Sequence, residues 1–210
     1  MERRSYGDPC GVARALDAVG ERWALLVVRE LLLGPKRFSA LHRGLGAASQ
    51  NVLAQRLREL EAAGVVRRRR LGPPAGSWVY ELTDEGSALE PVLVALGRWG
   101  RGRPATSDAE LSVDALMLAL QTTFDAAAAG DLEASLDLQV DDDRLAVTVA
   151  AGRLSVTRAS AKDPDATLRT DVPTLRELAF RKRRLDDAAA AGAAAIEGDR
   201  AAVQRLLDAF

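Results

Sequence analysis

Apolar residues recur at every third or fourth position through the first part of the chain, and this period is typical of amphipathic helices. Asp8 and Pro9 are start signals for a first helix, and Gly20 marks its end. Residues 23–33 are apolar on nearly every side, as expected of a buried central helix. Residues 38–45 then predict a short third helix.

A fourth helix is predicted over residues 50–63, with Ser49 as its N-cap and Gly64 at its C-terminal end. Its apolar stripe follows the spacing i, i+4, i+7 and consists of Leu53, Leu57 and Leu60. At 100° per residue, the side chains opposite this stripe are polar or small. This helix is therefore expected to be buried on one side and exposed on the other.

Two short segments, 65–71 and 77–82, predict the strands of a hairpin around a turn rich in Gly and Pro at 72–76. Thr83 and Gly86 open the last predicted helix of this half. Its apolar stripe comprises Leu89, Val92, Leu93, Leu96 and Trp99.

The second half of the chain mixes the two periods. An amphipathic helix is expected over 113–124, and strict alternation over 132–140 predicts a half-buried strand. Later segments that predict short strands are 145–149, 154–156, 166–170 and 193–197. Asp171 and Asp199 are expected to cap two further helices. We predict an α+β chain whose second domain is a helix, a meander of about four strands in an antiparallel sheet, and closing helices.

The balance of charged residues changes at the same place in the chain as the hydrophobic period. Residues 1–104 carry 17 lysines and arginines against 11 acidic residues, whereas residues 105–210 carry 12 against 19. Residues 101–108 are rich in Gly, Pro, Ser and Thr, as in a linker. We therefore predict a first domain at 1–102, a linker at 103–108 and a second domain at 109–210. The excess of positive charge suggests that the first domain faces an anion.

Several classes of site are excluded by composition. Cys10 is the only cysteine and His42 the only histidine, so an intrachain disulfide and a cysteine-rich zinc site are ruled out. No nucleophile with a base at a recognised spacing is present, and Asp141–Asp143 read as a turn, so no enzyme activity and no cofactor are expected. No apolar run reaches the length of a membrane span, and no signal peptide is evident, so we expect a cytoplasmic protein without a membrane span.

The polar face of the 50–63 helix carries groups suited to a DNA groove. Asn51, Gln55 and Arg58 lie opposite the leucine stripe, and Asn and Arg form bidentate contacts with base edges. Backbone N–H groups at Ser49 and Gln50 would favour a phosphate at the helix N-terminus. A polar helix face is more often merely exposed to solvent, and so is an arginine run. Together, on the basic half of the chain, the two features favour a nucleic-acid-binding function.

The arginine run 67–70 lies on the first strand of the predicted hairpin, where alternation sends Arg68 and Arg70 to one face. Phosphate contacts from that face would give affinity and steep salt dependence. Arg56, on the flank of the preceding helix, is a further phosphate candidate. The predicted DNA-binding residues are Ser49, Gln50, Asn51, Gln55, Arg56, Arg58, Arg68 and Arg70.

Several motifs in order resemble the HxlR-type winged helix-turn-helix transcriptional regulators. The matching segments are CGVARALDAVGERW, LLVVREL, GPKRFSAL, SQNVLAQRLRELEAAGVVRR and WVYELTDEG, which span about 90 residues. The resemblance implies a homodimer, formed largely by the first and last helices of this half and bound to an inverted-repeat operator. Cys10 matches a position that senses oxidants in some relatives, although a packing role is the commoner one. The sequence departs from the family where Gly11 stands in place of a frequent Pro.

Residues 109–210 resemble the sterol carrier protein type 2 fold, on the segments PTLRELAF and AIEGDRAAVQRLL. The resemblance implies an apolar cavity that holds a lipid-like ligand, although the same residue types also fill an ordinary core. The expected lining residues are Leu136, Leu138, Val147, Val149, Leu178 and Phe180. The cationic run 181–184 is either a solvated helix end or an anchor for an anionic head group.

The favoured interpretation is a homodimeric transcriptional regulator, a repressor of genes behind its operator, with double-stranded operator DNA as its partner. The second domain then binds an apolar or lipid-like effector or reinforces the dimer. The alternative is a lipid-binding carrier module whose basic half has nonspecific affinity for anions.

Overall fold

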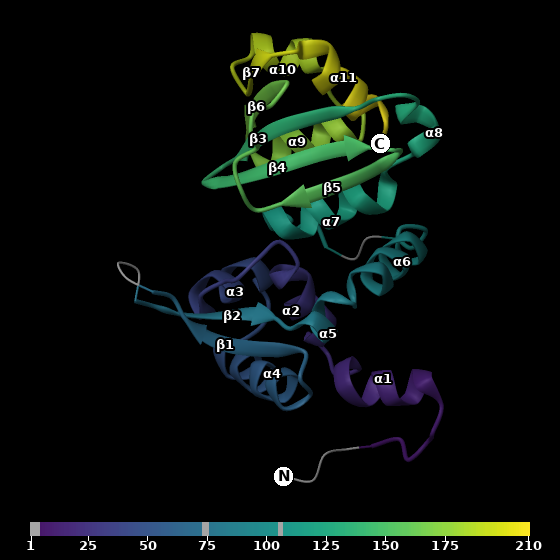
Figure 1. Ribbon diagram of the computed structural model, residues 1–210, viewed down its shortest axis with the longest axis vertical. Coiled ribbons are helices and arrows are strands. Elements are labelled where there is room, and N and C mark those ends of the chain that lie inside the picture. Colours follow the sequence, from purple (N-terminus) through teal and green to yellow (C-terminus); the bar gives the residue numbers. More distant parts are fainter. Residues whose placement is uncertain (1–4, 73–75, 105–106) are drawn as a thin grey trace. The chain divides into compact units, whose positions relative to one another are not determined.

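The computed structural model describes residues 5–72, 76–104 and 107–210, and the chain separates into two compact units, Met1–Leu93 and Val94–Phe210 (Figure 1). Residues 73–75 of the predicted turn and 105–106 of the predicted linker lie outside the described residues. The predicted domain limits and linker stay a prediction. Within the described ranges, no helix is long and apolar enough to cross a membrane.

The first unit contains a helical core with a two-stranded wing. Its elements are α1 (Gly11–Val19), α2 (Ala24–Leu31), α3 (Phe38–Leu45), α4 (Gln50–Ala62), β1 (Val66–Arg70), β2 (Trp78–Leu82) and α5 (Asp84–Ser87). α6 (Glu90–Gly100) runs across the division between the units. The core side chains come mainly from α2, α3 and α4, because these helices carry the widest apolar faces. The hairpin β1–β2 is antiparallel, with Arg68 opposite Tyr80.

Two sequence predictions for this unit are corrected by the structure. The helix expected from Thr83 onward is two helices, α5 and α6. Pro91 explains the break, since proline lacks an N–H to continue the helical ladder and its ring crowds the carbonyl four residues earlier. The N-cap of α1 is Cys10 rather than Asp8, whose carboxylate instead accepts a hydrogen bond from the Cys10 backbone N–H at 2.8 Å.

The second unit is built on a five-stranded sheet with the order β5-β4-β3-β6-β7. The strands are β3 (Ala134–Val140), β4 (Asp143–Ala150), β5 (Arg153–Thr157), β6 (Ala166–Thr170) and β7 (Ala194–Gly198). The helices of this unit besides α6 are α7 (Val113–Thr123), α8 (Ala126–Ala129), α9 (Val172–Ala179), α10 (Leu185–Ala190) and α11 (Arg200–Asp208). Asp171 and Asp199 cap α9 and α11 through their carboxylates, as predicted.

The predicted antiparallel meander is wrong in one respect. β3, β4 and β5 form a meander, but β6 crosses to the other edge of β3 and pairs with it in parallel, with Leu138 opposite Leu168. The sheet is therefore mixed. Helices α7 and α9 lie against this sheet in Figure 1, and their apolar faces close a core with the inward residues of the strands.

Candidate nucleic-acid interface

Helix α4 is seated in the first unit by its leucine stripe. Leu53, Leu57 and Leu60 are at most 1% exposed, so the helix has one fixed rotational setting. The Ser49 hydroxyl accepts a hydrogen bond from the Val52 backbone N–H at 3.3 Å and caps the helix. Ser49 and Gln50 are exposed, which leaves the helix N-terminus open to solvent.

The opposite side of α4 is open, as predicted from the helical period. Asn51 and Arg58 are exposed and Gln55 is half-buried. The Arg58 guanidinium donates to the Gln55 side-chain oxygen at 2.6 Å, and the Gln55 amide donates to Glu59 at 2.6 Å. These contacts hold Gln55 and Arg58 along one line on the surface. The face therefore offers amide and guanidinium donors to a polar ligand.

Arg56 is placed differently from the sequence prediction. Its side chain is only 12% exposed and pairs with Glu59 in the same helix and with Glu21, 3.7 Å away, in the segment after α1. Its charge is thus shared with two carboxylates inside the unit. This arrangement favours a structural role, fixing α4 against the end of α1, over the predicted phosphate contact.

The wing separates its four arginines into two pairs. Arg67 and Arg69 each donate to the Glu81 carboxylate at 2.8 Å. The hydrogen bond from Arg69, together with that from Arg67, holds the pKa of Glu81 below its ordinary value. Glu81 therefore remains ionised and balances part of the positive charge on this face.

On the other face of the wing, no described residue supplies such a carboxylate. The Arg68 guanidinium lies over the Trp78 ring, 4.5 Å from its centroid, and 6.0 Å from that of Tyr80. Arg70 donates to the Gly76 carbonyl oxygen at 3.1 Å. Cation–π stacking holds Arg68 in place and leaves its N–H edge available. The described contacts thus leave Arg68 and Arg70 as the two wing charges without an ionic partner.

Sequence reasoning missed a buried charge that joins the core to the wing. Glu30 of α2 is fully buried and accepts from Lys36 at 2.9 Å and from Arg29 at 2.9 Å. Lys36 also exchanges backbone hydrogen bonds with Tyr80 of the wing. A Cβ on Gly44 would lie 2.1 Å from a Glu30 oxygen, so a larger residue there would require the Glu30 carboxylate to move. The signal was present, since Arg29 and Glu30 interrupt an otherwise apolar helix.

Further candidate chemistry lies at Cys10 and in the second unit. Cys10 is an exposed free thiol at the start of α1. The described part of the chain contains no cluster of three or more His, Cys, Asp or Glu side chains suited to a metal ion.

The second unit encloses an apolar cavity of about 30 Å³ between the sheet and its helices. Its lining is entirely apolar: Met117, Leu120, Leu136, Leu138, Val147, Leu154, Val156, Leu168, Leu175, Val203, Leu206, Leu207 and Phe210. Three of the predicted lining residues, Leu136, Leu138 and Val147, are among them. The lining residues that lie on helices could have been predicted from the apolar stripes of α7 and α11.

The other three predicted lining residues do not line this cavity. Val149 lies two residues further along β4 than Val147 and pairs with Ala134 and Leu154. Leu178 lies about one turn beyond Leu175 on α9 and faces a different pocket. Phe180 follows the last residue of α9 and is half-buried.

Known proteins resemble the two halves of the chain separately. The model of the HxlR-like helix-turn-helix family matches residues 18–107. The transcriptional regulator YvaP of Bacillus subtilis is 41% identical over 86 residues, which are 41% of this chain and 80% of YvaP. The chain belongs to the HxlR-like family. YodB of the same organism, also a transcriptional regulator, is 36% identical over 85 residues, 40% of this chain and 76% of YodB.

The HxlR-like assignment makes the chain a DNA-binding transcriptional regulator and not an enzyme. The solved reduced form of YodB is 32% identical, covers 48% of this chain and all of that one, and has a TM-score of 0.41. Residues 104–210 belong to the alkyl sulfatase C-terminal family. The predicted likeness to sterol carrier protein type 2 is not confirmed by these matches.

Proposed function

We propose that this HxlR-like regulator binds an inverted-repeat operator as a homodimer and inserts α4 into the major groove. Binding represses the genes downstream of the operator. The observation that carries the proposal is the orientation of α4. Its leucines are buried, whereas Asn51 and Arg58 are exposed at the positions from which they would reach base edges. Gln55, half-buried beside Arg58, would act with it in the groove.

Phosphate contacts would come from both sides of the recognition helix. The open N-terminus of α4 at Ser49 and Gln50 would accept a phosphate, since its N–H groups and dipole favour an anion. Arg68 and Arg70 of the wing would neutralise phosphates on the flank. These contacts would position the protein, and the α4 side chains would read sequence.

A homodimer is supported by apolar side chains left on the surface of α1 and α6. Val12 and Leu16 are 68% and 42% exposed on α1, and Trp99 and Leu96 are 64% and 45% exposed on α6. Exposed apolar stripes of this kind mark interaction surfaces. A second copy would cover them with the same stripes through a two-fold axis, which also matches the symmetry of an inverted repeat.

The second unit would have a sterol carrier protein-like fold and would act as the effector-binding domain. Its apolar lining, with Leu136, Leu138 and Val147 among others, suits an apolar ligand, and the cavity of about 30 Å³ would have to widen to hold one. Such a ligand controls DNA binding only if it prefers one of two conformations of the dimer. For a tenfold change in operator affinity, the free energies of ligand binding to the two conformations must differ by about 1.4 kcal/mol.

The direct test is titration of a labelled duplex from the gene's own promoter and of a scrambled duplex, each at two salt concentrations. We expect tighter binding of the promoter duplex at both salts and weaker binding of both duplexes at the higher salt. Equal affinities for the two duplexes would instead identify a nonspecific anion binder.

A further inference from the structure

The wing carries a large aromatic side chain that the hydrophobic core does not use. Trp78 is 50% exposed, whereas Val79, the next residue on β2, is buried. Side chains alternate between the two faces of a strand, so Trp78 lies on the face that points away from the core. The pairing of β1 with β2 places Arg68 and Arg70 on that same face. The indole is thus available for an interaction at the surface of the wing.

Arg68 reaches this indole diagonally across the hairpin. Arg70 is the residue directly opposite Trp78, and Arg68 stands opposite Tyr80, further from the hairpin turn. The guanidinium that lies over the Trp78 ring, 4.5 Å from its centroid, is nevertheless that of Arg68. The Arg68 side chain therefore leans along the wing toward the turn, where Arg70 donates to the Gly76 carbonyl oxygen. Two guanidinium groups are thereby gathered near the end of the wing.

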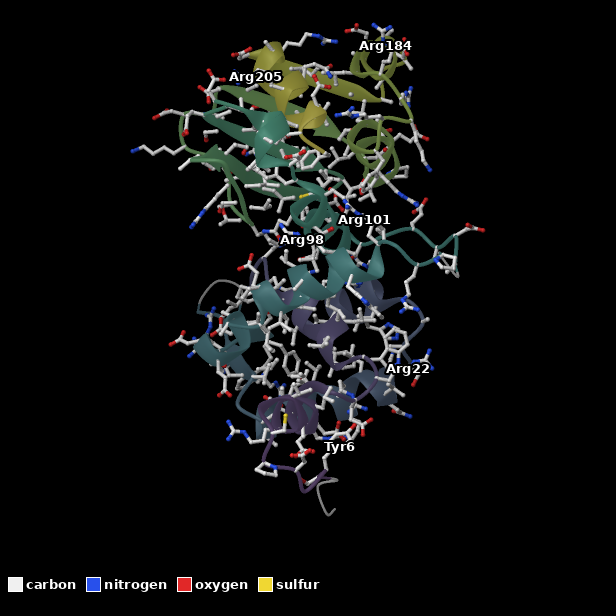
Figure 2. All side chains as sticks on the ribbon, turned by 90° about the vertical axis from the view of Figure 1, so that its right-hand side faces the viewer. Tyr6, Arg22, Arg98, Arg101, Arg184 and Arg205 are labelled. Carbon is white, nitrogen blue, oxygen red and sulfur yellow. The ribbon has the colours of Figure 1, made fainter. Side chains whose placement is uncertain are left out.

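The other two tryptophans also have an arginine over their rings, but that arginine is a near neighbour in the sequence. Arg22, labelled in Figure 2 at the surface of the first unit, lies 5.3 Å from the centroid of the Trp23 ring. Arg103 lies 4.2 Å from the centroid of the Trp99 ring. The wing stack differs because it joins two strands and holds a cation that we propose to contact DNA.

Stacking restricts a side chain that is otherwise flexible. An arginine has many rotamers, and fixing such a side chain when a complex forms costs affinity. A guanidinium that already lies against an indole has lost part of that freedom before DNA binds. Its N–H edge remains free to donate to an anion. The stack therefore prepares the Arg68 guanidinium for a phosphate contact.

We propose that Trp78 is a positioning residue for DNA binding, whose indole holds the Arg68 guanidinium in the orientation in which it meets a backbone phosphate. The inference rests on the proposed function, in which Arg68 neutralises a phosphate beside the groove that receives α4. It assigns Trp78 no DNA contact of its own. Trp78 therefore raises the affinity for every duplex and adds no preference for the promoter sequence.

The test compares Trp78→Leu and Trp78→Phe with the wild type by fluorescence anisotropy, using the promoter duplex and a scrambled duplex. Leucine keeps an apolar side chain but offers no π face, so Arg68 regains its freedom. We expect both duplexes to bind about two- to tenfold more weakly per protomer, or about 4- to 100-fold for the homodimer. Phenylalanine keeps a face for the cation and should recover most of this loss. Thermal unfolding of each variant checks that it is folded.

Two further readouts separate positioning from a general role in the fold of the wing. The salt slope of Trp78→Leu should stay close to that of the wild type, because Arg68 still neutralises its phosphate once bound, whereas Arg68→Ala lowers the slope by about 0.9 per protomer. In the Arg68→Ala background, Trp78→Leu should cause no further loss, because the positioned guanidinium is gone. The matched control is the Arg67→Ala background, whose missing cation is a partner of Glu81, and there Trp78→Leu should cause its full loss.

The outcomes separate this inference from the proposed function. Unchanged affinity of Trp78→Leu would overturn the positioning role, while preference of the wild type for the promoter duplex would still support operator binding. An equal loss with and without Arg68 would assign Trp78 a contact or a structural role of its own and would also overturn it. A slope as low as that of Arg68→Ala would show that the phosphate contact itself is lost, which contradicts positioning. Equal affinities of the wild type for the two duplexes would refute the proposed function instead.

Discussion

The division of the wing arginines predicts a specific salt dependence. Arg68 and Arg70 lie on the face without a carboxylate, whereas Arg67 and Arg69 share Glu81 at 2.8 Å. Removing Arg68 and Arg70 deletes the two wing charges that we propose to contact phosphates, but removing Arg67 deletes a charge already balanced within the wing. Glu81 keeps Arg69 in that variant, so Arg67→Ala is a matched control on the same strand.

The magnitude follows from counterion release. Each neutralised phosphate contributes about 0.9 to the slope of log affinity against log salt, so the change Arg68→Ala with Arg70→Ala lowers the slope by about 1.8 per protomer. Over a tenfold range of salt this is about a 60-fold smaller loss of affinity for each protomer, or about 4,000-fold for the homodimer. Fluorescence anisotropy measures the slope for the promoter duplex and the slope for the scrambled duplex. In the double variant the two slopes should fall by the same amount. A slope change in Arg67→Ala as large as half of that in the double variant would refute the assignment of faces.

Three further predictions concern stability, assembly and redox chemistry. Because the pKa of Glu81 is lowered in the folded state, its stabilisation is present above its ordinary value of 4.5 and is lost as the pH falls through the folded value. Urea unfolding of Glu81→Gln should therefore depend less on pH in that acidic range, and parallel profiles would contradict this. Val12→Glu should convert a dimer into a monomer in sedimentation and weaken operator binding, whereas an unchanged dimer would place the interface elsewhere. Cys10→Ser should abolish release of DNA by quinone or peroxide if Cys10 is a sensor, and an unchanged response would exclude it.

Local patterns in the sequence were sufficient for most elements of the fold. The Ser49 cap and the leucine stripe of α4 depend on residues within one or two turns, and the structure confirms both. The parallel pairing of β6 with β3 was missed because alternation shows which face of a strand is buried but not which strand lies beside it. The short helix α10 was hidden in an alanine-rich stretch without a clear apolar period.

In the candidate site, as in the fold, the features that depend on local sequence were predictable. The helical period gave the exposed face of Asn51 and Arg58, which the structure reproduces. The position of Arg56 depends on Glu21, far away in sequence, and no local pattern indicates such a pair. The buried Glu30 differs, since its partners Arg29 and Lys36 lie within six residues of it in the sequence. Long-range pairing of charges is the part of the site that required coordinates.

The central claim is that the exposed face of α4 reads base edges, and Arg58→Ala tests it most directly. The measurement is the ratio of affinities for the promoter duplex and a scrambled duplex, at one salt concentration, for wild type and variant. A guanidinium that reads a base contributes about 1–3 kcal/mol of discrimination, so the ratio should fall about 5- to 150-fold, with much less change in scrambled-duplex affinity. An unchanged ratio would contradict the orientation of the recognition helix on which the account depends.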